Sequence, residues 1–198
     1  MAGDTWAEGN DIDVCVESLA TALRNGPLAL GFEVPIFVSI PNGPKRLTAA
    51  RSGEFGKRLP SRPFSASVGA TSLVTGLVVV SYILNTLRSL VPEATPTLDW
   101  RSPPVGPGRQ MPFEALVTDQ QKTADTRHIE DAHLVFQRGM RDAANFQSSV
   151  EEPVCLSLLE GMMLRTGWKT DPAILSIPCL VVRAHAPEHH PYSTSTAW

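Results

Sequence analysis

Apolar positions near the start of the chain change from a helical to a strand-like spacing. From Asp11 onward, apolar residues recur at three- and four-residue steps, which is one face of an amphipathic helix, and Asn25-Gly26-Pro27 ends it. Residues 28–32 are then apolar without alternation, as in a strand that is covered on both faces. The pattern predicts a helix over residues 11–25 followed by a buried strand.

A long uncharged stretch lies between Arg62 and Arg88, and residues 68–84 are strongly apolar. Its length approaches the roughly 20 residues that a membrane span needs. Several Ser, Thr and Asn side chains interrupt the apolar run, and Gly69 and Gly76 leave small notches for close packing. We therefore expect a helix over residues 66–90 that is buried in an α/β core, with a membrane span as the alternative.

Two strands and two helices are predicted in the second half of the chain, where they continue the succession of helices and strands in the first half. We predict a strand at residues 113–118, a helix over residues 126–145, a helix that opens at Glu151-Glu152-Pro153 and closes at Thr166-Gly167, and a last strand at residues 179–182. This alternation predicts the α/β class with a mostly parallel sheet, in a single domain over residues 1–184. Residues 185–198 are rich in Pro, His, Ser and Thr and are expected to form a disordered tail. Three strands are few for a stable sheet, so others either lie in the loops or are missing at the N-terminus.

The composition describes an ordinary globular protein of 198 residues, with 42% hydrophobic residues and a net charge of -3. This balance gives no basic footprint for nucleic acid outside one local cluster, which suits either phosphates or a solvated loop: Lys45, Arg46, Arg51, Lys57, Arg58 and Arg62. Cys15, Cys155 and Cys179 are widely spaced in apolar runs, which predicts buried free thiols. Together with a polar N-terminus that is unlike a signal peptide, the free thiols indicate a cytoplasmic protein.

Four ionisable residues are candidates for a functional site. Glu33 directly follows the first predicted strand, and Glu114 lies in the second. His128 and Asp131 are three residues apart near the start of a predicted helix, beside an apolar stripe formed by Ile129, Ala132, Phe136, Met140 and Ala143. Sites in open α/β sheets gather outside the carboxyl ends of the strands, and carboxylates beside an imidazole suit metal or proton chemistry. The alternative is a solvent-facing strand end and a helix N-terminus whose dipole favours acids.

Three short motifs resemble the RNase H-like superfamily. His128-Ile129-Glu130-Asp131-Ala132 resembles its last catalytic helix, RuvC-like resolvases in particular, where the Asp binds metal. Residues 30–35 resemble a strand that ends in a metal-binding acid, as in predicted RNase H-like nucleases of unknown function, and Phe113-Glu114 is similar to a later strand that bears a glutamate. The order of the elements across residues 11–184 is similar as well.

The resemblance implies an RNase H-like mixed sheet flanked by helices, in a hydrolase that uses Mg²⁺ or Mn²⁺ to cleave phosphodiester bonds of nucleic acid. Glu33 and Asp131 would be metal ligands, Glu114 a third carboxylate, and His128 would orient or activate water. The superfamily's first strand carries an essential Asp within a three-stranded meander, but only about ten residues precede the first predicted helix here. The chain is therefore expected to be a truncated gene product, a fragment from a wrongly placed start or a degenerate member of the superfamily.

Three functions are open on the sequence alone. The first is a divergent RNase H-like nuclease. The second is a catalytically inactive scaffold or interaction protein of the same fold, motivated by the missing first acid. The third, ranked below both, is a membrane-associated protein that uses residues 66–87 as a span. The substrate and the oligomeric state are open in each case.

Overall fold

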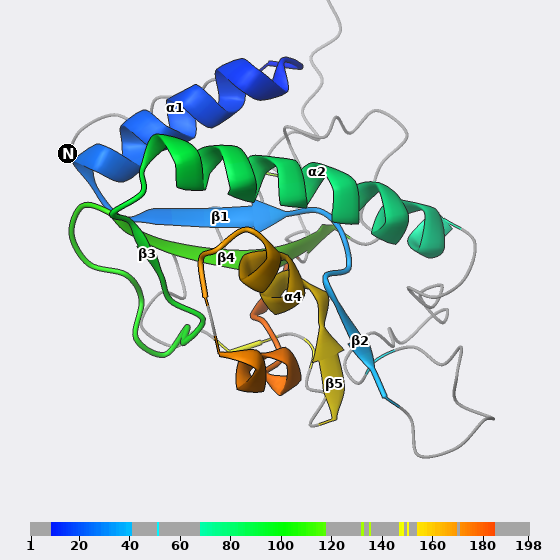
Figure 1. Ribbon diagram of the computed structural model, residues 1–198. Helices are drawn as coiled ribbons and strands as arrows, with labels where there is room; N and C mark the ends of the chain where they lie inside the picture. Colours follow the sequence, from blue (N-terminus) through cyan, green and yellow to red (C-terminus); the bar gives the residue numbers. More distant parts are fainter. Residues whose placement is uncertain are drawn as a thin grey trace, which may run out of the picture.

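Two long helices lie over one face of a small parallel sheet, as Figure 1 shows for the part of the chain that is described. The computed structural model describes residues 9–40, 51, 68–117, 132, 135, 147, 148, 150, 154–169 and 171–184. Over these ranges the architecture is mixed α/β, with a partly parallel sheet and helices. The predicted fold class is confirmed at that level.

Helix α1 (Ile12–Asn25) follows the predicted bounds because its N-cap and its stop signal are both local. The Asp11 carboxylate accepts hydrogen bonds from the amides of Asp13 and Val14, at 2.9 and 3.2 Å, which satisfies two of the free donors of the first turn. Its buried side consists of Val16, Ala20 and Leu23. Cys15 lies next to this buried side of α1 but is exposed, so the prediction that its thiol is buried was wrong. Cys155 and Cys179 are buried, as predicted.

The main sheet is built around its longest strand, β4 (Arg109–Val117). Strand β1 (Leu28–Phe32) pairs with β4 on one side, and β3 (Thr95–Pro96) and β6 (Val181–Ala184) pair with opposite ends of β4 on the other. All of these pairings are parallel, as predicted. In the register of β1 with β4, Phe32 is the partner of Glu114.

A separate antiparallel pair joins β2 (Phe37–Ser39) to β5 (Cys155–Ser157). Helix α4 (Leu158–Arg165) begins directly after β5, with Ser157 as its N-cap, and Gly167 follows it at a φ of 78°. The helix therefore starts later than the predicted Glu151-Glu152-Pro153, because residues 155–157 are held as a strand by β2. A short 3-10 helix, η2 (Pro172–Ser176), precedes β6.

Helix α2 (Val68–Leu90) is present as predicted, but its burial is partial. Val80, Ile83, Leu84 and Leu87 are buried on one side, while Val74 and Val78 are exposed on the other. A Cβ added at Gly76 would come within 2.8 Å of the Val34 side chain, which confirms the predicted packing notch there. By length and composition residues 70–90 could span a membrane, and 22% of the apolar stretch is buried.

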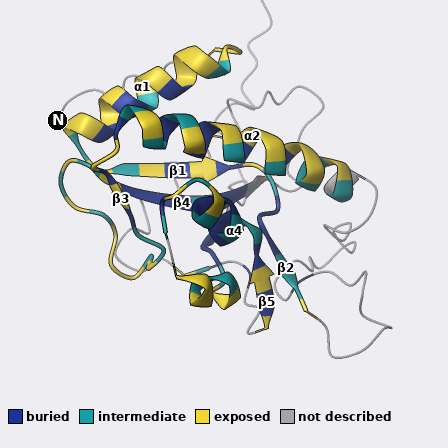
Figure 2. Cartoon of the chain, in the orientation of Figure 1, coloured by how far each residue is buried: buried dark blue, intermediate teal, exposed yellow. Residues whose placement is uncertain are grey.

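Hydrophobic cores lie on both faces of the main sheet. Figure 2 shows that β4, the strand between them, consists largely of buried positions. The larger core joins α1, α2 and α4 to the face that carries Leu30 and Phe32. In it, the indole Nε1 of Trp168 donates to the Leu84 carbonyl at 2.8 Å and so fixes the end of α4 against α2. The smaller core, on the opposite face, contains Met111, Ala115, Val135, Leu180 and Val182.

Candidate functional site

The parallel pairing of β1 with β4 brings the strands of Glu33 and Glu114 side by side. Glu33 follows Phe32 directly, and Phe32 is the register partner of Glu114. Residues paired in register point to the same face of a sheet, so Glu114 shares the face of Phe32, which is buried in the larger core. The Glu33 side chain is exposed. The two predicted acids are thus neighbours along the sheet, but they lie in different surroundings.

Glu114 forms a buried ion pair with Arg51, and both side chains are 0% exposed. The guanidinium contacts both carboxylate oxygens, with Nη1 2.9 Å from Oε2 and Nη2 2.5 Å from Oε1. The amide of Ile36 donates to Oε2 at 3.0 Å. Such a two-pronged contact between arginine and carboxylate is among the strongest polar interactions in proteins.

Arg51 is held in place by β2 as well as by Glu114. Its Nη1 donates to the Phe37 carbonyl at 3.1 Å, and its guanidinium carbon lies 4.4 Å from the centroid of the Phe37 ring. Arg51 thereby links β2 to the middle of the main sheet. In the sequence analysis Arg51 belonged to a basic cluster that was expected either to bind phosphates or to lie in a solvated loop. Arg51 is completely buried, which contradicts both expectations for this residue.

This ion pair determines what Glu114 can do. Both of its oxygens are engaged, so a cation at this carboxylate would have to displace the guanidinium. Separating a buried ion pair leaves an uncompensated charge and costs about 3–5 kcal/mol. In this arrangement Glu114 anchors Arg51 in the core.

A second buried acid, Glu160 of α4, was missed by the sequence analysis. It is 0% exposed, and neither of its carboxylate oxygens has a hydrogen-bond partner among the residues described. Burial raises its pKa from 4.5 to about 8, so the folded protein holds Glu160 in the neutral form at pH 7. A lone acid within an otherwise apolar run, Leu158-Leu159-Glu160-Gly161-Met162-Met163, was the available sequence signal.

Cys179 lies close to both buried acids. The Glu114 amide donates to the carbonyl of the next residue, Leu180, at 2.9 Å. Burial, and then the charges of Glu114 and Glu160, raise the pKa of the Cys179 thiol well above its usual value. The thiol is therefore protonated and unreactive at neutral pH. Arg51, Glu114, Glu160 and Cys179 form a cluster of titratable groups inside the larger core.

The other two predicted site residues, His128 and Asp131, lie outside the described residues. Two nearby positions are described, and both are helical. Ala132 is exposed, which contradicts its place in the predicted apolar stripe, whereas Val135 is buried in the smaller core. Over the described ranges, no three His, Cys, Asp or Glu residues are grouped so that they could hold a metal ion.

No protein-family model matches the chain, and no match was found among curated proteins or solved structures.

Proposed function

We propose that this chain is a divergent RNase H-like protein whose chemistry is the metal-dependent hydrolysis of phosphodiester bonds in nucleic acid. The supporting observation is the parallel pairing of β1 with β4, which places Glu33 just beyond the carboxyl end of β1, at an edge where α/β proteins build sites. The motif that contains His128 and Asp131 follows β4 in the order expected of that superfamily.

The fit of these residues to a divalent cation differs from one to the next. Glu33 offers a carboxylate oxygen, the donor type that Mg²⁺ and Mn²⁺ prefer, on an exposed side chain. Glu114 does not fit as a ligand while Arg51 holds its oxygens. Glu33 and Asp131 are thus the proposed ligands, with His128 as the group that orients water. A bound cation would supply an activated water and stabilise the charge that develops on phosphorus.

A cleavage assay tests this proposal. Wild-type protein with Mg²⁺ or Mn²⁺ is expected to cut at least one of branched DNA, an RNA–DNA hybrid or single-stranded DNA. Glu33→Gln and Asp131→Asn are each expected to reduce the rate by about 100-fold or more, because each removes a charged ligand.

Glu17→Gln is the matched control, since Glu17 is an exposed acid on α1. It should cleave at the wild-type rate. Equal activity in wild type, Glu33→Gln and Asp131→Asn would remove the proposed roles of both acids.

The second candidate is a non-catalytic scaffold or interaction protein of the same fold. The buried ion pair favours it, because a carboxylate that stabilises the core is no longer available as a third ligand. For this candidate, calorimetric titration with Mg²⁺ or Mn²⁺ is expected to show no binding tighter than about 1 mM. Micromolar binding that Glu33→Gln abolishes would contradict it and support the nuclease.

A further inference from the structure

The outward side of α2 presents an apolar ridge. Val74, Val78 and Tyr82 are four residues apart and are exposed by 64%, 69% and 43%. Residues at this spacing line up along one side of a helix, and Val79 widens the ridge. Figure 2 shows exposed positions along the outer sides of both α2 and α1. A contiguous row of exposed valines along a helix is typical of a surface that binds a partner protein or a membrane.

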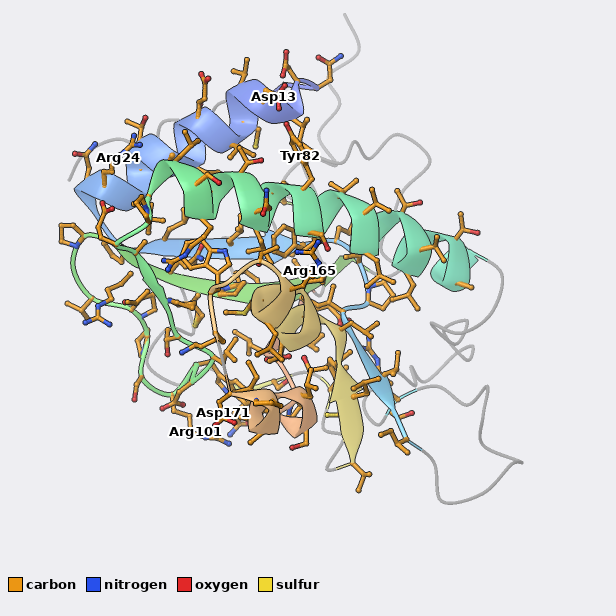
Figure 3. The ribbon with its side chains drawn as sticks, in the orientation of Figure 1. Asp13, Arg24, Tyr82, Arg101, Arg165 and Asp171 are labelled. Carbon is orange, nitrogen blue, oxygen red and sulfur yellow. The ribbon has the colours of Figure 1, made fainter. Side chains whose placement is uncertain are left out.

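The ridge continues onto α1, and the two helices are fixed to one another at both ends. Tyr82 points toward Asp13 in Figure 3, and its hydroxyl donates to the Asp13 carboxylate. Val14, the next residue, is 60% exposed. At the opposite end, Nη2 of Arg24 donates to the Leu90 carbonyl at 2.6 Å. The apolar surface thus spans a braced two-helix layer, which we call the α1–α2 face.

The charges and the side-chain types on the α1–α2 face favour a second copy of the chain over a membrane as its binding partner. Residues 68–87 contain no charged residue, so two copies of the ridge can meet without repulsion between like charges. Charges of both signs, such as Asp13, Glu17 and Arg24, lie on α1, where they suit a polar rim. A helix that lies on a membrane usually has Lys and Arg beside Trp, Phe or Leu, but the exposed large apolar residues here are four valines and one tyrosine.

The outline of the α1–α2 face lies just below the area of small specific dimer interfaces, which suits a weak dimer. Helices of 23 and 14 residues are about 35 and 21 Å long and about 10 Å wide, which gives an outline of roughly 560 Å². Small specific interfaces bury roughly 600–800 Å² per partner. We infer that a second copy of this chain docks on this face, with α2 packed against α2 across a twofold axis. Ridges of four-residue spacing pack at about -50°, which places Val78 near the crossing point.

Sedimentation equilibrium of the full chain, from about 1 to 200 µM, tests the inference. Wild type is expected to be dimeric at the upper end of this range. Val78→Glu is expected to raise the dimer dissociation constant by about 100-fold or more, because it buries an unpaired charge in the interface. Ala173→Glu introduces the same charge at an exposed position of η2, outside the α1–α2 face, and should leave dissociation unchanged.

Cysteine cross-linking provides a second measurement that does not depend on the folding of the glutamate variant. Val78→Cys in a Cys15→Ser background is expected to form a disulfide-linked dimer on mild oxidation, whereas Ala173→Cys in the same background should not. A wild type that stays monomeric at about 200 µM overturns the inference, as does a dimer that Val78→Glu leaves intact. Monomers that float with phosphatidylcholine vesicles would assign the face to a lipid surface instead.

Discussion

Replacing Arg51 by methionine is expected to destabilise the folded protein by about 3–5 kcal/mol, because it leaves a buried carboxylate without its partner. Glu114 would keep the Ile36 amide, 3.0 Å from Oε2, but lose both guanidinium contacts where solvent does not reach. Domains are stable by only about 5–15 kcal/mol, so this single change removes a large part of the total. Urea unfolding followed by circular dichroism measures the loss.

Two matched variants distinguish the stability lost by leaving a buried charge unpaired from the stability lost by removing any arginine. Arg101 is exposed, with its guanidinium carbon 4.9 Å from the Trp100 ring centroid, so Arg101→Met is expected to cost only about 0.5–1 kcal/mol. In the double variant Arg51→Met with Glu114→Gln, the unpaired charge is gone, and we expect about half of the loss or more to be recovered. Equal losses for Arg51→Met and Arg101→Met would contradict a special role for the buried pair.

Long periodic elements could be predicted from the sequence, and short strands could not. The helix at α1 shows a repeated apolar spacing together with a local stop signal, and β1 and α2 coincide with continuous apolar runs in the sequence. Strands β2, β3 and β5 have only two or three residues, which is too short for a period to appear. Phe37 pairs with Ser157, far along the chain, so β2 and β5 are defined by each other and not by local sequence.

The same limit applies to the candidate site. The positions of Glu33 at the end of one strand and of Glu114 within another followed from the apolar runs beside them, whereas the direct pairing of these two strands was not predicted. The partner of Glu114 was not predicted either, because Arg51 lies in a Pro-, Gly- and Arg-rich stretch without periodicity, 63 positions away. Cys15 fits a helical stripe by spacing but lies outside the narrower stripe that is buried. Periodicity predicts which face of an element is apolar, whereas buried polar pairs depend on tertiary structure.

The largest pH-dependent effect is expected at Glu160. Replacing it by glutamine should stabilise the protein at pH 7 by up to about 3 kcal/mol, because the wild type must take up a proton at this side chain when it folds. Burial raises the pKa of Glu160 from 4.5 to about 8, so the folded protein still holds the proton at pH 7. That pH is 2.5 units above the pKa of 4.5 that the carboxyl has in the unfolded chain. At about 1.36 kcal/mol per unit, this interval gives the expected stabilisation.

The direction of the pH dependence follows from the same proton. Below pH 4.5 the Glu160 carboxyl is protonated in both states, and its contribution to stability is at its most favourable. Between pH 4.5 and about 8 the folded state alone holds the proton, so wild-type stability falls as the pH rises. Above about 8 both states are ionised at this residue and the loss is complete. Glutamine, which does not titrate, removes this slope.

Urea unfolding at several pH values between 5 and 8 measures the difference between wild type and Glu160→Gln. Cys179, whose pKa is raised in the folded state, contributes a slope only near pH 8, and it is present in both proteins, so this contribution cancels in the comparison. The two stability curves are expected to lie close together at pH 5 and to diverge steadily toward pH 8. Glu17→Gln, at an exposed acid, should follow wild type throughout. Parallel curves for wild type and Glu160→Gln would mean that Glu160 is ionised in the folded protein, which requires a partner for its carboxylate.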